Sequence, residues 1–113
     1  MKKRLLPIAL FLMFALSVTV NAAILVHITS DLTISGNEAE AYVSVLEKNK
    51  DISVTMKLWE GNSLVGTWSD TGTTFVTMSE TFSSVQAGKT YILKITGTIN
   101  GVAFPEVQVT RYT

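Results

Sequence analysis

Few residues of this 113-residue chain have the types and spacing that catalysis requires. His27 is the only histidine, and the chain contains no cysteine. A metal site needs several His, Cys or clustered carboxylate ligands, and a serine nucleophile needs a base and a group that orients the base. The serines have only His27 as a conventional base, and no Gly-x-Ser-x-Gly motif occurs. We therefore expect no catalytic residue, no cofactor and no metal ion, and we interpret His27 as an edge-strand residue.

Carboxylates also lack the arrangement of a hydrolase or a calcium site. Glu38 and Glu40 are two residues apart on a predicted strand, so they share one face, which we interpret as solvent-facing. A glycosidase needs two carboxylates across a cleft, and calcium needs several oxygen ligands in one loop. The segments 49–51 and 70–73 offer only one or two such oxygens each.

Three aromatic side chains form the one set that suggests a binding surface: Trp59, Trp68 and Tyr42. The two tryptophans flank Gly61-Asn62, a predicted hairpin turn, and Trp59 is out of phase with the apolar residues of its own strand. We therefore expect both indoles on one exposed face. Exposed aromatic rings stack on sugars or anchor a protein partner.

The alternative interpretation of these aromatic residues is purely structural. β-Sandwiches commonly bury a tryptophan on the third strand, and a bulge in the hairpin would turn Trp59 inward. A cross-strand pair of Trp59 and Trp68 would then stabilise the hairpin without any ligand. Single exposed aromatic residues seldom mark a binding site, which favours this alternative.

The elements that must position these residues are β-strands. The chain beyond residue 22 is rich in β-branched residues, shows no helical apolar period, and is interrupted by Gly, Asn and Asp at short intervals. Seven strands are predicted, over residues 24–34, 39–46, 52–60, 63–69, 74–85, 90–99 and 102–111. Turns about every eight to twelve residues are typical of a sandwich. The sequence thus predicts an all-β fold, a single immunoglobulin-like antiparallel β-sandwich of about seven strands.

Specific turns and core positions follow from this pattern. The polar segments 47–51 and 70–73 are predicted turns, and Asn100-Gly101 is a predicted type I′ hairpin turn. Without a disulfide between the sheets, apolar residues such as Val43 and Leu93 must fill the core. Leu58 is predicted to join them, because it alternates in phase with Ile52, Val54 and Met56. Tyr91 follows a Gly-Lys-Thr turn and is predicted to form a tyrosine corner, in which its hydroxyl bonds back to upstream backbone.

The N-terminus has the pattern of a secretory signal peptide. Lys2, Lys3 and Arg4 precede an apolar run, and Val20 and Ala22 place small residues before a cleavage site. The run is shorter than the ~20 apolar residues that a membrane span needs. We expect residues 1–22 to be a signal peptide, cleaved after Ala22 or the next alanine. Residues 23–113 are then one secreted domain with no stable membrane anchor.

The charge beyond residue 22 excludes some partners. Six Lys or Arg and nine Asp or Glu give this part a net charge of −3. Scattered lysines on a mildly acidic domain do not form the basic surface that nucleic acid requires, so we expect no nucleic-acid partner. The same balance argues against a cationic membrane-active peptide.

Four segments resemble a group of small secreted bacterial proteins of unknown function, known mostly from Firmicutes. They are Leu32–Gly36 (LTISG), Met56–Asn62 (MKLWEGN), Thr67–Ser69 (TWS) and Val85–Tyr91 (VQAGKTY). The resemblance implies a signal peptide followed by one β-sandwich domain, and it brings no activity, cofactor or site residues.

The expected function is that of an exported, non-enzymatic binding or interaction module for an unidentified protein or glycan. One alternative is a small secreted effector of bacteriocin or toxin type. A second alternative, a secreted hydrolase, is disfavoured because every catalytic arrangement lacks a member.

Overall fold

The computed structural model describes residues 26–113, and strands account for most of them. They are β1 (His27–Ser35), β2 (Glu38–Glu60), β3 (Ser63–Phe82), β4 (Thr90–Ile99), β5 (Val102–Ala103) and β6 (Val107–Tyr112). None of the described residues forms a helix that is long and apolar enough to cross a membrane. The predicted signal peptide, residues 1–22, lies outside the described part of the chain.

Two long strands organise the fold. β2 has 23 residues and β3 has 20, and they pair with each other over most of their length as one antiparallel hairpin. The first half of β2 also pairs with β1, and its second half pairs with β4, which in turn pairs with β5 and β6. The described strands thus form one six-stranded antiparallel sheet.

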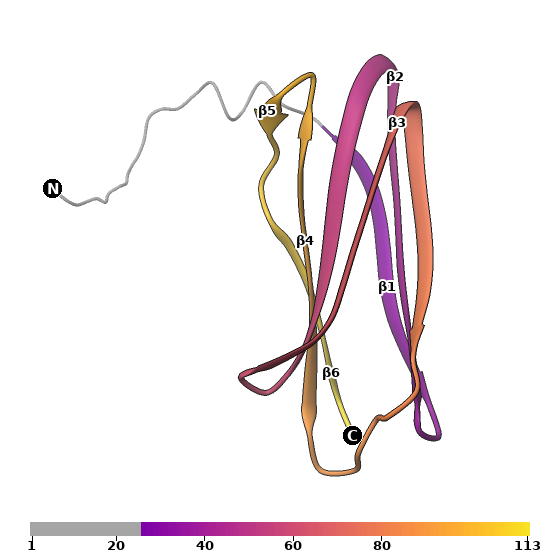
Figure 1. Cartoon of the computed structure of the whole chain (residues 1–113), viewed down its shortest axis with the longest axis vertical. Coiled ribbons are helices and arrows are strands. Elements are labelled where there is room, and N and C mark those ends of the chain that lie inside the picture. The colour runs from indigo at the N-terminus through magenta and orange to yellow at the C-terminus, as the bar shows by residue number, and fades with distance from the viewer. Residues whose placement is uncertain (1–25) are drawn as a thin grey trace, which may run out of the picture.

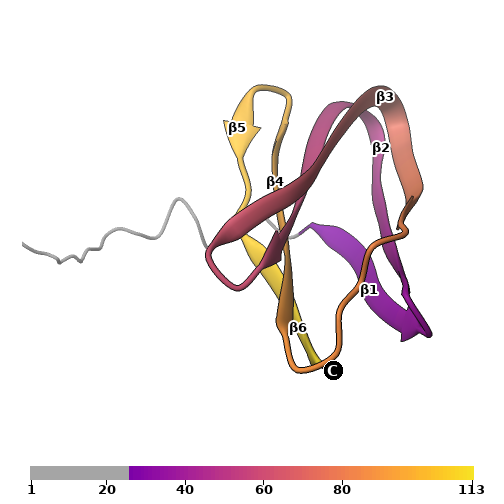
Figure 2. The same cartoon turned by 60° about the horizontal axis from the view of Figure 1, so that its bottom comes forward.

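The sheet is folded into two facing layers. Figures 1 and 2 show that the β2–β3 hairpin is bent, with its tip beside β4 and its other half beside β1. We call the part built from β1, residues 38–47 and residues 74–82 the first layer. The second layer is built from residues 51–60, residues 63–73, β4, β5 and β6. The predicted all-β antiparallel sandwich is confirmed, and its immunoglobulin-like topology stays a prediction.

The two polar segments predicted as turns, 47–51 and 70–73, do not reverse the chain, so that prediction was wrong. Instead, they lie opposite each other at the bend of the hairpin. Residues 48–50 have no partners in β3, because the pairing shifts between Glu47 and Asp51. This β-bulge bends the strand where it leaves one layer and enters the other. Four predicted strands are therefore two long ones, and the last predicted strand is divided into β5 and β6.

The bulge also explains the pattern of burial along β2. The buried positions are odd-numbered before the bulge and even-numbered after it, as in Ala39, Ala41, Val43 and Val45 and then Ile52, Val54, Met56 and Leu58. Because side chains alternate along a strand, an odd number of inserted residues exchanges its two faces. The apolar side chains of β2 therefore point into the core both before and after the bend.

Hydrogen bonds fix the bend to the Asn100-Gly101 turn. Both residues of that turn have positive φ, 49° and 80°, as the predicted type I′ geometry requires. The Asn100 side chain accepts a hydrogen bond from the Asp51 N–H at 2.8 Å, and the Asn100 N–H donates to the Asp51 carbonyl at 2.7 Å. The Asn49 N–H donates to the Thr74 hydroxyl at 3.1 Å across the bulge.

A tyrosine corner closes the opposite end of the sandwich, as predicted. The Tyr91 side chain is fully buried, and its hydroxyl accepts a hydrogen bond from the Gln86 N–H at 2.9 Å. The hydroxyl also donates to the Glu60 carboxylate, a partner that lies at the end of β2. The contact therefore ties the loop before β4 to the β2–β3 hairpin.

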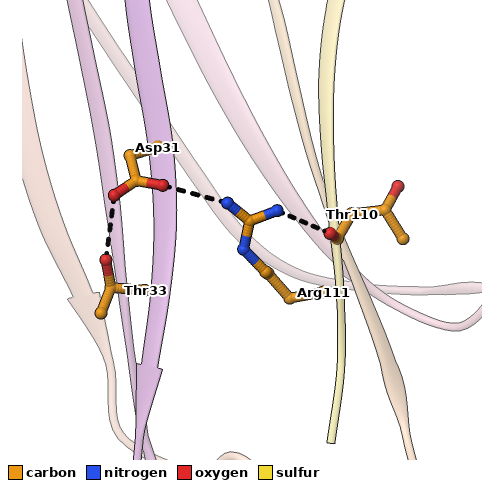
Figure 3. A network of polar contacts seen from close by, with 4 residues as sticks. All are labelled: Asp31, Thr33, Thr110 and Arg111. Atoms are coloured by element: carbon orange, nitrogen blue, oxygen red, sulfur yellow. Dashed lines mark hydrogen bonds and ion pairs between the residues drawn. The ribbon is translucent and has the colours of Figure 1, made fainter.

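A polar cluster bridges the edge strands β1 and β6, which come close without forming a ladder (Figure 3). Arg111 donates to the Asp31 carboxylate at 3.2 Å and to the Thr110 carbonyl at 2.9 Å. Thr33 donates to the same carboxylate at 3.1 Å. The side chains of Arg111 and Asp31 are about half exposed, 47% and 56%. Exposed ion pairs contribute only ~0–1 kcal/mol, so this cluster joins the layers weakly.

Candidate binding face

The structure separates the three aromatic residues proposed as one contact surface. Trp59 lies opposite Leu64 on β3 and Ile92 on β4, whereas Trp68 lies opposite Met56. Directly opposite residues share a face, and Met56 is buried in the core. Trp59 therefore faces outward and Trp68 faces inward, so the prediction of two indoles on one exposed face was wrong. The alternative, in which a bulge turns Trp59 inward, was also wrong.

A second bulge causes this difference. At the tip of the hairpin Glu60 pairs with Ser63 and Trp59 with Leu64, but the next pair is Leu58 with Gly66. Val65 is the extra residue. Without it, the register would place Trp68 opposite Thr55, on the same face as Trp59. The one-residue shift carries Trp68 to the other face.

Trp68 covers the margin of the core. It is partly buried and packs against the core cluster. Its ring lies over Gly66, where an added Cβ would come within 2.3 Å of the indole. The glycine thus provides the space that the indole fills, and Trp68 belongs to the packing of the second layer.

Tyr42 lies on a third surface, the outer face of the first layer. It is opposite Asp31 on β1 and Ser79 on β3, and it is partly buried. The largest apolar feature on that face is the cross-strand pair of Leu46 and Phe75, of which Phe75 is 62% exposed. The hydroxyls of Ser44 and Thr77, 3.3 Å apart, separate this pair from Tyr42. This face therefore carries two separate apolar positions instead of a continuous patch.

Trp59 is the centre of a continuous apolar row on the outer face of the second layer. The row crosses three strands, from Leu64 through Trp59 to Ile92, and Tyr112 lies diagonally beyond it on β6. Leu64 is 47% exposed and Tyr112 is 80% exposed, whereas Trp59 and Ile92 are partly buried. The indole N–H of Trp59 is covered and has no hydrogen-bond partner among the described residues. We call the outer face of the second layer the tryptophan face; it is formed by residues 51–60 of β2, residues 63–73 of β3, and strands β4 and β6. Exposed apolar patches of this kind tend to mark interaction sites.

Two lysines adjoin the row. Lys94 places its ammonium nitrogen 5.3 Å from the centre of the Trp59 ring, a cation–π contact. Lys57 lies directly opposite Lys94 in the neighbouring row. Among residues 26–113, neither lysine forms an ion pair, since the two ion pairs found there are His27–Glu47 and Arg111–Asp31. The tryptophan face therefore combines an indole with two uncompensated positive charges.

Hydroxyl groups continue the tryptophan face toward the bend. Beyond the lysines, the outward positions are threonines and serines, namely Thr67, Ser69 and Thr71 on β3, Ser53 and Thr55 on β2, and Thr96 and Thr98 on β4. The strip ends in an open hollow of about 330 Å³. Its lining is Asp51, Ile52, Ser53, Thr71, Gly72, Thr73, Thr98 and Gly101.

His27 lies outside this surface. It begins β1 with a side chain that is 80% exposed, so its interpretation as an edge-strand residue is confirmed. The backbone N–H of His27 donates to the Glu47 carboxylate at 3.1 Å, and this hydrogen bond lowers the pKa of Glu47. Within the described range, no three His, Cys, Asp or Glu side chains come together as metal ligands.

Sequence reasoning found part of the tryptophan face and missed the rest. The alternation along β2 is visible in the sequence and places Lys57 beside Trp59 on one face. Lys94, Leu64 and Ile92 join that face only through the pairing of β2 with β3 and β4, which no local pattern specifies.

Sequence comparison assigns no family to the chain. No protein family model matches it, and no curated protein matches it. The resemblance to small secreted bacterial proteins therefore stays a prediction, and the tryptophan face is the main evidence for function.

Proposed function

We propose that this protein is an exported, non-enzymatic binding module that contacts its ligand through the tryptophan face. The observation that carries the proposal is the row of Leu64, Trp59 and Ile92, an apolar surface on a side of the sheet that faces away from the core. Aromatic and apolar anchors supply most of the binding energy at recognition surfaces. The strands that carry Trp59 and Ile92, β2 and β4, are held on both sides by neighbours, so this part of the surface is preorganised.

The proposal predicts that Trp59→Ser weakens binding and that the loss of Phe75, an aromatic residue that is more exposed than Trp59, does not. Labelled protein would be incubated with intact cells of the producer, with rival cells and with purified cell wall, and the bound label would be measured. We expect Trp59→Ser to reduce binding about tenfold or more, because a central aromatic anchor is lost. Phe75→Ser, on the outer face of the first layer, is the matched control and should leave binding unchanged.

The opposite result would reject this surface. If Phe75→Ser abolished binding and Trp59→Ser did not, the ligand would contact the first layer. Growth arrest of the rival cells by the unmodified protein would instead favour the effector alternative.

Export is a separate part of the proposal. The basic start, the apolar run and the small residues before position 23 support cleavage after Ala22. Intact-mass analysis of the culture medium should therefore find a product that begins Ala23-Ile24. Recovery of the protein only from membranes, with Met1 or Lys2 at its N-terminus, would contradict export and leave the tryptophan face as a separate question.

A further inference from the structure

Building on the proposed function, we infer that the ligand of the tryptophan face is an acidic glycan, whose sugar carboxylate or sulfate groups bind between Lys57 and Lys94. The residues around this pair supply contacts for the remainder of such a chain.

The lysine pair places two like charges side by side. Lys57 and Lys94 are directly opposite each other on neighbouring antiparallel strands. Like charges in this arrangement are destabilising. The remainder of the domain is mildly acidic, yet no acidic side chain in the described region forms an ion pair with either lysine. Glu106, the residue before β6, accepts a hydrogen bond from Gln108 at 3.0 Å.

An anion placed between the two ammonium groups would remove this repulsion. Side chains directly opposite each other have Cβ atoms about 5 Å apart, so two lysines can approach one carboxylate or sulfate together. Hydrogen bonds to charged groups are the stronger ones in proteins. The contact of Lys94 with the Trp59 ring holds its ammonium over the row, beside the surface on which a sugar ring would lie.

The surface beyond the lysines fits a polyhydroxylated chain. From Trp59 to Ser53 the strand rises ~20 Å, and over this length the outward positions offer hydroxyl groups such as Thr55 and Thr96. The hollow at the bend closes the strip with further hydroxyls and the carboxylate of Asp51. An indole, two cations and a row of hydroxyl donors and acceptors match a chain of acidic sugars.

An acidic peptide fits this face less well. Extended peptides bind by adding a strand to a free sheet edge, where main-chain groups are unpaired. β2 and β4, which carry Trp59, Lys57 and Lys94, are both paired on their two sides, so only side chains are offered. Nucleic acid would require more positive charges than these two lysines, because its affinity comes from many phosphate contacts.

Binding of defined glycans tests the inference. Oligogalacturonate of about six sugars, long enough to cover the ~20 Å strip, would be titrated against the purified protein by calorimetry at low salt. A heparin-derived oligosaccharide tests sulfate in place of carboxylate. Methyl-esterified oligogalacturonate has the same backbone without charge, and poly-glutamate has the charge without sugars. The protein variants are Lys57→Gln and Lys94→Gln, with Lys48→Gln in the bulge as a control for net charge.

The expected result is binding of at least one charged glycan, weakened about three- to tenfold by Lys57→Gln and by Lys94→Gln and unchanged by Lys48→Gln. Binding should weaken as the salt concentration rises. The melting temperature of Lys57→Gln should be equal to or above that of the unmodified protein, because repulsion between the strands is removed. Lys94→Gln removes the same repulsion but also the cation–π contact with Trp59, so its melting temperature is not used as a test.

Three outcomes would overturn the inference: no binding of either charged glycan, equal binding of poly-glutamate, or a lower melting temperature of Lys57→Gln. A further result separates it from the proposed function. If the esterified and charged glycans bind equally, and Trp59→Ser abolishes both, the tryptophan face is a binding site and the role of the lysines is rejected. If Trp59→Ser changes binding to no cell, cell wall or glycan, the proposed function itself fails.

Discussion

Replacing Leu93 by alanine is expected to lower the free energy of unfolding by about 2 to 5 kcal/mol. Leu93 is fully buried in the middle of β4, where it lies opposite Leu58 on β2 and Val109 on β6. The substitution removes apolar contacts and leaves a cavity that strands paired on both sides cannot close. In a domain without disulfides the loss is a large part of a total stability of ~5–15 kcal/mol.

Urea denaturation followed by circular dichroism measures this effect. Leu58→Ala should give a loss of similar size, because Leu58 is also fully buried. Thr96→Ser, at an exposed position of the same strand as Leu93, is the control and should change stability by less than about 0.5 kcal/mol. Losses of only a few tenths of a kcal/mol for both leucine variants would mean that the core does not lie between these strands.

The core was predictable from the sequence because alternation is a local property. Leu58 and Leu93 were both expected inside, and both are fully buried. The same reasoning placed Val43 in the core. A strand that is buried on one side must alternate between apolar and polar residues. This alternation is the same whichever strand pairs with it.

The bends of the hairpin were not predictable in the same way. Polar residues and positive-φ positions at Asn49 and Thr74 resemble the signals of chain reversal. Here they belong to a bulge, because both flanks continue to pair with the same partner strand. A turn and a bulge use the same residue types, and only the pairing of the flanks tells them apart.

The candidate site was the least predictable part, for the same physical reason. A single extra residue, Val65, moves Trp68 from the expected outer face to the core. The lysine pair depends on the register between β2 and β4, whose paired residues Lys57 and Lys94 are 37 positions apart. The alternation along β2 predicted correctly that Trp59 points outward. Its neighbours on the tryptophan face, such as Ile92 and Lys94, lie on another strand and could not be predicted from that alternation.

Replacing Tyr91 by phenylalanine is expected to destabilise the protein by about 2 kcal/mol, although the ring and its packing are retained. The Tyr91 hydroxyl accepts from the Gln86 N–H and donates to the Glu60 carboxylate. Phenylalanine leaves both groups without this partner in a part-buried place, and one of the two bonds that are lost involves a charged carboxylate, whose hydrogen bonds are the stronger ones. Tyr42→Phe is the control, because no hydrogen bond of its hydroxyl is found in the described residues. A urea midpoint that is unchanged in Tyr91→Phe would show that the corner contributes nothing to folding.

The same hydroxyl makes stability depend on alkaline pH. Burial, assisted by the hydrogen bond to Glu60 and by its negative charge, raises the pKa of Tyr91 above its ordinary value of 10.0. The folded protein therefore keeps this proton at a pH where the unfolded chain has released it. The contribution is fully present below pH 10 and is lost as pH rises through the raised pKa. We expect the stability difference between the unmodified protein and Tyr91→Phe to be constant from about pH 7 to 9 and to shrink above about pH 10. Because the two proteins differ only at this position, the difference isolates Tyr91. A difference that stays constant up to about pH 11 would show that its hydroxyl titrates alike in the folded and unfolded chains.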